Sequence, residues 1–187
     1  MTEPALLLTL LDFAFIGLLP VVFFRRDGRL GPLWWLTALP FFGCPVLLVA
    51  AYAADLGPLV PDGWTGPLEL ASVVSAVASI ALISLTLGTH RIPLALWHQQ
   101  NDAPRHLVTY GAYSRIRHPF YTSFLLAFLG AVALFPHWAT LALLGYGAAV
   151  LNFTAAREEG RLGESEFGAE YRRYVARTGR FLPRLTA

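Results

Sequence analysis

The stretch PFYTSFLLAFLGAVALFPHWATLALLGYGAAVLNFTAA, residues 119–156, consists of two apolar runs without a single Asp, Glu, Lys or Arg. The runs cover about 119–135 and 138–156, and only Phe135, Pro136 and His137 separate them. A connection this short joins antiparallel helical neighbours, so the stretch predicts a tight helical hairpin. A membrane-crossing helix needs about 20 mostly apolar residues, and the hairpin therefore need not span a bilayer fully.

Three further apolar stretches precede the hairpin, at about 4–24, 32–54 and 67–89. The chain is 56% hydrophobic and only 14% charged, whereas soluble domains carry about 25% charged residues. The basic residues of the first stretch follow its apolar run, so we expect a retained span and not a cleaved signal peptide. The prediction is an all-α polytopic membrane protein with about five transmembrane helices, forming a single membrane domain over 1–187.

The arginines indicate how the chain is oriented. All fourteen basic residues are Arg, and they follow the first, third and fifth spans. The loop at 55–67 contains acids and no Arg. Because Arg in short loops favours the cytoplasmic side, we expect the N-terminus outside and the C-terminus in the cytoplasm, in an inner or plasma membrane. The net charge of +2 is too small to indicate nucleic acid as a partner.

The chain then divides into three N-terminal spans at 1–89, a cytoplasmic loop at 90–118, the hairpin at 119–156, and a cytoplasmic helix and tail at 157–187. The last segment mixes charges with apolar residues that are five, four and three positions apart: Leu162, Phe167, Tyr171 and Tyr174. This spacing puts them roughly along one face of an amphipathic helix.

A hairpin brings the start of its first helix close to the end of its second. Arg117 and His118 should therefore lie beside Glu158 and Glu159, at a solvent-accessible cleft on the cytoplasmic face. Pro119 suits a first helical position, and the free amides there suit an anionic group. The two acids suit a cation or sugar hydroxyls, so the expected ligand combines both characters.

The other polar residues indicate less. Asp12 lies in the middle of the first span and either forms an interhelical hydrogen bond or marks a proton or ion site. Cys44 is expected to be a packing residue. The five histidines contain no HEXXH motif or other i, i+4 pair with an adjacent acid, so we expect no metal site. The sequence assigns no role to His90 or His98.

Two motifs resemble a known family. They are HLVTYGAYSRIRHPFY at 106–121 and EEGRLGESEFGAEYRRY at 158–174. In this order, across a hairpin, they resemble the integral-membrane methyltransferases typified by isoprenylcysteine carboxyl methyltransferase, which have phospholipid methyltransferases as relatives. The resemblance covers about 87–183. It implies S-adenosylmethionine as cofactor and a lipophilic small molecule or lipidated acceptor that enters from the membrane lipids.

The resemblance also implies roles for individual residues. Arg117, His118 and Glu158 would be catalytic, and the cofactor would be bound by His106, Leu107, Val108, Gly111, Tyr113, His118, Tyr121, Glu158 and Glu159. The chain departs from the family pattern at Ser123, where Gly is frequent, and at Thr154, where Arg is frequent. The second departure weakens the inference that the acceptor is a prenylcysteine carboxylate, so carboxylate, thiol and amine acceptors all remain open.

Two other functions are compatible with the sequence. Membrane reductases of the sterol-reductase type bind NADPH and share an R-H-x-x-Y element, but the paired acids and the residues after them favour methyl transfer. A small transporter or scaffold without enzymatic activity would need paired charges inside the spans, where Asp12 stands alone.

Overall fold

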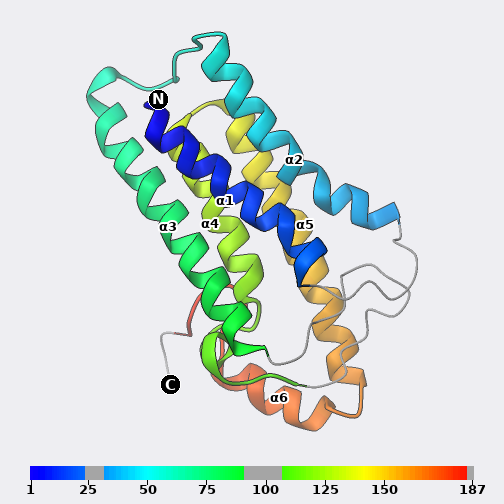
Figure 1. The fold of residues 1–187 in the computed structure, drawn as a ribbon. Coiled ribbons are helices and arrows are strands. Elements are labelled where there is room, and N and C mark those ends of the chain that lie inside the picture. The colour runs from blue at the N-terminus through cyan, green and yellow to red at the C-terminus, as the bar shows by residue number, and fades with distance from the viewer. Residues whose placement is uncertain (24–31, 91–106, 185–187) are drawn as a thin grey trace.

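The computed structural model describes residues 1–23, 32–90 and 107–184 (Figure 1). The regular structure in these residues is helical except for one isolated parallel bridge, between Ile116 and Gly179. The helices, in chain order, are α1 (Glu3–Val22), α2 (Pro32–Ala53), the 3₁₀ helix η1 (Asp62–Trp64), α3 (Thr65–Thr89), the 3₁₀ helix η2 (Gly111–Ser114), α4 (Pro119–Leu134), α5 (Trp138–Glu164) and α6 (Gly168–Arg177). The predicted all-α class is thus confirmed.

Four of these helices, α1, α2, α3 and α5, are long and apolar enough to cross a membrane. The first helix of the predicted hairpin, α4, has 16 residues. At 1.5 Å per residue it is about 24 Å long, which is less than the hydrocarbon thickness of about 30 Å. The hairpin itself is present, because α5 begins four residues after α4 ends.

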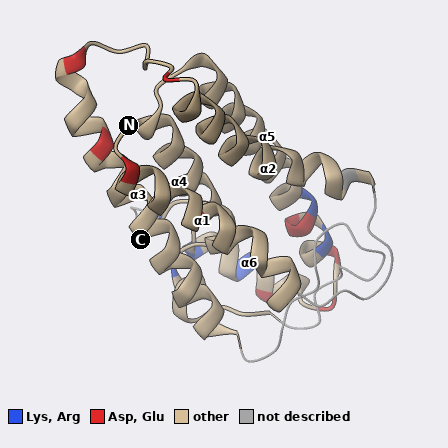
Figure 2. Ribbon diagram, turned by 45° about the horizontal axis from the view of Figure 1, so that its top comes forward, with Lys and Arg blue, Asp and Glu red and all other residues tan. Residues whose placement is uncertain are grey.

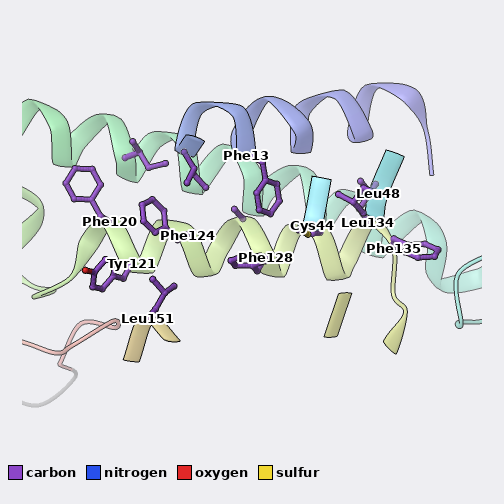
Figure 3. Packing of buried hydrophobic residues seen from close by; sticks show 14 of the residues in the cluster. Phe13, Cys44, Leu48, Phe120, Tyr121, Phe124, Phe128, Leu134, Phe135 and Leu151 are labelled. Carbon is purple, nitrogen blue, oxygen red and sulfur yellow. The ribbon is translucent and has the colours of Figure 1, made fainter. Parts of the chain in front are cut away.

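Helix α4 lies in the middle of the bundle, with α3 along one side (Figure 1). Its aromatic residues form much of the core, and Phe124 and Phe128 are each 1% exposed (Figure 3). Phe128 also packs edge to face on Phe13 of α1. Gly147 of α5 makes room for this ring, since a Cβ there would lie 3.0 Å from it. Small residues that let helices approach closely are typical of membrane helix packing.

The outer faces of the long helices expose large apolar side chains, such as Leu11 of α1, Val46 of α2, Val74 of α3 and Phe153 of α5. In Figure 2 most charged residues lie near the ends of the bundle; Asp12, in the middle of α1, is buried. A soluble monomer rarely exposes apolar surface this continuously, so the arrangement fits a protein that is surrounded by lipid.

The C-terminal part differs from the expected single helix that starts near residue 157. Helix α5 continues to Glu164, and α6 begins only at Gly168. Ser165 is extended and its hydroxyl accepts a hydrogen bond from the amide of Phe167, which ends the first helix. A Cβ at Gly168 would lie 2.4 Å from the carbonyl oxygen of Gly163. Gly168 therefore allows the tight turn between the two helices.

The structure shows the interhelical hydrogen bond that was one of the two interpretations of Asp12. The carboxyl group of Asp12 is fully buried, and its Oδ1 accepts a hydrogen bond of 2.8 Å from Ser79 of α3. Within the described residues, Oδ2 has no hydrogen-bond partner. The bond joins α1 to α3 inside the apolar bundle.

Ser79→Ala should destabilise the folded protein by about 1 kcal/mol, because interhelical hydrogen bonds in membrane proteins contribute about that much. Thermal unfolding in detergent would measure the change. Ser84→Ala is the matched control. Ser84 is exposed on the same helix, and its hydroxyl donates a hydrogen bond to the backbone carbonyl of Ile80, one turn earlier in that helix. Equal effects of the two substitutions would contradict a role for the bond to Asp12.

Candidate functional site

The C-terminal strap, residues 178–182, lies along the segment that leads into α4. The amide of Arg117 donates to the carbonyl of Gly179 at 2.9 Å, and the amide of Gly179 donates to Arg115 at 3.2 Å. The amide of His118 donates to the carbonyl of Arg180 at 3.1 Å. The backbone thereby holds the strap in register with the first of the two sequence motifs.

Glu159 of α5 is the centre of a dense polar cluster. Its Oε1 lies 3.0 Å from Nε of Arg117 and 3.2 Å from Nε2 of His118. Arg180 of the strap donates to both oxygens, at 3.1 Å from Nε to Oε1 and 2.6 Å from a terminal nitrogen to Oε2. This carboxylate raises the pKa of Arg180. Glu159 thus connects α4, α5 and the strap.

The Glu159 cluster is mostly buried, which corrects the expectation of a solvent-accessible cleft at these residues. The side chains of Arg117 and His118 are each 10% exposed, and that of Glu159 is 14% exposed. Arg117 also donates to the carbonyls of Val175 and Thr178. A buried carboxylate with two arginines in direct contact is typical of a structural ion-pair network.

Glu158 has a different environment. Its Oε1 accepts a hydrogen bond of 2.6 Å from the hydroxyl of Tyr121, and its Oε2 lies 3.5 Å from Nδ1 of His118. The rings of His118 and Tyr121 are stacked, with centroids 5.2 Å apart and an interplanar angle of 3°. Glu158 is 35% exposed, more than twice the 14% exposure of Glu159. It is therefore the acid better placed to meet a ligand.

His118 lies between the two acids. Its Nε2 faces Glu159 and its Nδ1 faces Glu158. A neutral imidazole carries one N–H and can donate to only one of these carboxylates, whereas the cation donates to both. The position of His118 therefore makes its two carboxylate contacts depend on its protonation.

Tyr113 of η2 is held from two sides. Its backbone carbonyl accepts a hydrogen bond of 2.7 Å from Tyr174 of α6, and its hydroxyl lies 2.9 Å from Nε2 of His90. Burial raises the pKa of the Tyr113 hydroxyl, and the negative charge of Glu158 adds to the effect. Burial also raises the pKa of Tyr174 to about 12, against the opposing charges of Arg117 and Arg177. Both phenols are thus neutral at physiological pH.

Gly111 was expected to bind the cofactor, and the structure shows a local reason for a glycine there. Its φ is +59°, and a Cβ would lie 2.3 Å from Oγ1 of Thr89. The amide of Ala112 donates to the same Thr89 oxygen at 3.4 Å. The glycine lets η2 lie against the end of α3, which in turn places Tyr113.

The structure places the remaining predicted residues less directly. Val108 is buried and Leu107 is half-buried ahead of η2, and His106 and His98 lie outside the described residues.

Arg180 was not singled out from the sequence. Arg180 falls in the segment that was expected only to form a cytoplasmic helix and tail, and an Arg more than 20 positions from the paired acids has no periodic relation to them. The site therefore unites the predicted Arg117, His118, Tyr121, Glu158 and Glu159 with an additional cation.

Gly179→Ala should detach the strap, since a Cβ at this position would lie 1.7 Å from the carbonyl oxygen of Leu182. Overpacking of this kind costs about 1–3 kcal/mol, and thermal unfolding in detergent would measure it. Gly160→Ala is the control, because a Cβ there meets nothing within 4 Å and should stabilise α5 by about 0.5–1 kcal/mol. A tolerated Gly179→Ala would mean that the strap is not held as described.

The fold and the site together define a class of protein. It is a helical protein in which four helices are long and apolar enough to cross a membrane. At one end of the bundle it has a polar site of carboxylate, arginine and histidine side chains. No family model matches the chain. Over 126 residues it is 33% identical to the cobalt-zinc-cadmium resistance protein CzcN of Cupriavidus metallidurans. The match covers 67% of this chain and 54% of CzcN, so the chain spans about half the length of this relative. In the described ranges, no three His, Cys, Asp or Glu residues are grouped to hold a metal ion.

Proposed function

We propose that the chain is a membrane-embedded methyltransferase that uses S-adenosylmethionine and methylates a lipophilic or membrane-associated acceptor. One observation carries the proposal: the two motifs that resemble the isoprenylcysteine carboxyl methyltransferase family are in contact. His118 meets Glu159 across 41 positions of sequence at 3.2 Å, and Tyr121 meets Glu158 across 37 positions at 2.6 Å. Because the motifs come from separate helices, their contact supports a common function.

The proposed topology has the site at the cytoplasmic face, the N-terminus outside, and α4 as a fifth and shorter membrane helix. The described arginines support it, because they all follow η2 in the chain, at the end of the bundle that carries the site. The opposite end carries the acids Glu3, Asp55, Asp62 and Glu69. Arg25, Arg26, Arg29, Arg91 and Arg105 lie outside the described residues. Helix α5 has 27 residues and is about 40 Å long, so its last turns would project from the bilayer with α6.

The residues around Glu158 fit the proposed cofactor. Its carboxylate can accept hydrogen bonds from an ammonium or from ribose hydroxyls, while Tyr121 and His118 orient it. Glu159 and Arg117 hold the helix ends in place and are assigned a structural role. The cofactor supplies an electrophilic methyl group on a sulfonium. The protein contributes mainly by holding donor and acceptor in line, which can account for most of the rate, and this requires no metal ion.

Calorimetry on the purified full chain in detergent would test the proposal with S-adenosylhomocysteine and NADPH as separate ligands. We expect binding of S-adenosylhomocysteine and none of NADPH. Binding of NADPH alone would favour a membrane reductase. Binding of neither ligand would favour a transporter or scaffold without enzymatic activity. Mass spectrometry of membrane extracts incubated with labelled S-adenosylmethionine would identify the acceptor as a carboxylate, thiol or amine.

The similarity to CzcN favours a second candidate function, in cobalt, zinc or cadmium resistance. Resistance describes a phenotype and not a reaction, so the two proposals are compatible. Cells that express the chain would be compared with cells that express Glu158→Gln on media containing each metal. Equal tolerance of both, together with methyl transfer by the wild type, would separate the enzyme from the resistance phenotype.

A further inference from the structure

Asn152 is a polar residue on a face of α5 that otherwise exposes small and apolar side chains. It is exposed, as are Ala149 and Ala156, which lie about one turn before and after it. The neighbouring Phe153 is 61% exposed. Polar side chains within membrane-crossing helices are costly and usually have a partner or a function, so the position of Asn152 indicates one.

The partner of Asn152 is Arg180 of the strap, whose guanidinium also binds Glu159. One terminal nitrogen donates to Oδ1 of Asn152 at 2.7 Å, while Nε and the other terminal nitrogen donate to Glu159 at 3.1 and 2.6 Å. Residues seven positions apart lie on nearly the same side of a helix and about 10 Å apart along its axis. Arg180 therefore connects the outer surface of α5 at Asn152 to the Glu159 cluster.

The hydrogen-bonding groups that remain on this pair are mainly donors. A guanidinium has five N–H groups and accepts no hydrogen bond, and three bonds of Arg180 leave two of them. Because the guanidinium only donates, the atom of Asn152 that it meets is the carbonyl oxygen. The two N–H groups of Nδ2 remain, and within the described residues they donate to no acceptor. The pair thus offers four N–H groups, which suit an anion.

Charge and position along α5 agree with an anionic ligand at the membrane surface. Glu159 accepts hydrogen bonds from both Arg117 and Arg180, so the two guanidinium groups exceed its charge by one. The guanidinium of Arg180 lies between the levels of Asn152 and Glu159, about 21–32 Å along α5 from its first residue, Trp138. The hydrocarbon layer is about 30 Å thick and the headgroups lie directly outside it.

We propose that Asn152 and Arg180 form a binding site for the headgroup of an anionic phospholipid. The phosphate oxygens accept hydrogen bonds from the remaining N–H groups of Arg180 and from Nδ2 of Asn152. Arg180 is 32% exposed, so the headgroup can reach it. The exposed Phe153 beside Asn152 gives the acyl chains an apolar surface, which favours a lipid over a free phosphate ion.

Native mass spectrometry of the full chain in detergent would measure binding of phosphatidylglycerol and of phosphatidylcholine with the same acyl chains. The wild type should bind phosphatidylglycerol more tightly. Asn152→Leu keeps the ion pair of Arg180 with Glu159 but removes the Nδ2 donors, and should weaken phosphatidylglycerol binding about 10-fold. Arg180→Gln removes the positive charge and should abolish the preference for this lipid. Because Arg180→Gln also weakens the Glu159 cluster, Asn152→Leu is the deciding variant.

Ser84→Leu is the matched control for Asn152→Leu, because Ser84 is an exposed polar residue of α3. Arg184→Gln is the control for Arg180→Gln, since Arg184 is exposed and donates to the carbonyl of Ala176. Both controls should bind phosphatidylglycerol like the wild type.

Equal binding of the two lipids by the wild type, or unchanged phosphatidylglycerol binding in Asn152→Leu, would overturn the proposal. Displacement of phosphatidylglycerol by inorganic phosphate would assign the site to a free anion and overturn the choice of a lipid. The measurement uses no S-adenosylhomocysteine, so its outcome is independent of the proposed methyltransferase activity.

Discussion

Glu159→Leu is expected to destabilise the folded protein by about 3 kcal/mol, the largest stability effect of any single substitution at this site. Removing one member of a buried ion pair costs about 3–5 kcal/mol, because the partner charge remains buried without compensation. Here Arg117 is 10% exposed and would lose its carboxylate, whereas Arg180 is 32% exposed and can be partly solvated. We therefore expect a value at the lower end of that range.

Thermal and denaturant unfolding in detergent would measure this loss for Glu159→Leu. Glu164→Leu is the matched control on the same helix, since Glu164 is exposed and its replacement should change stability by less than about 0.5 kcal/mol. Limited proteolysis should also cleave the strap faster in Glu159→Leu, because Arg180 and Arg117 would no longer be joined. Similar unfolding of the two variants would show that Glu159 is not the structural centre of the site.

Glu158→Gln should have the largest effect on activity and little effect on stability. The amide oxygen of Gln can still accept the hydrogen bond from Tyr121, so the local packing is kept. The lost negative charge removes a charge-assisted hydrogen bond to the ligand, which contributes about 1.5–3 kcal/mol. This corresponds to about 10- to 150-fold weaker cofactor binding.

Calorimetry with S-adenosylhomocysteine and a methyl-transfer assay would both follow Glu158→Gln, with thermal unfolding as the check on the fold. Tyr121→Phe should give a smaller loss, because it removes the group that orients the carboxylate and not the carboxylate itself. Unchanged affinity and turnover in Glu158→Gln would refute the assignment of Glu158 to the ligand. The contrast between adjacent acids, one affecting binding and the other folding, is the sharpest test of the site.

The different roles of Glu158 and Glu159 could not be predicted from the sequence. The hairpin placed Arg117 and His118 beside the paired acids, because a short connection leaves antiparallel helices few alternatives. The hairpin geometry did not separate Glu158 from Glu159, since adjacent residues on a helix differ by only about 100° around its axis, and only the family resemblance gave Glu158 an additional catalytic role. Which of them turns inward depends on what packs against α5, and that is the strap with Arg180. The strap is an extended segment without periodicity, so no pattern predicted its path.

The sequence by itself determined the helical class, the apolar surfaces, the hairpin and the meeting of its two motifs. These follow from local periodicity, from hydrophobicity and from the shortness of one loop, all of which can be read along the chain. Only the tertiary structure decided that α5 runs on to Glu164, that Asp12 bonds Ser79, that Gly111 accommodates Thr89, and that Arg180 completes the Glu159 cluster. Each of these depends on contacts between distant segments, whose free energy is set by packing in three dimensions and leaves no regular spacing in the sequence.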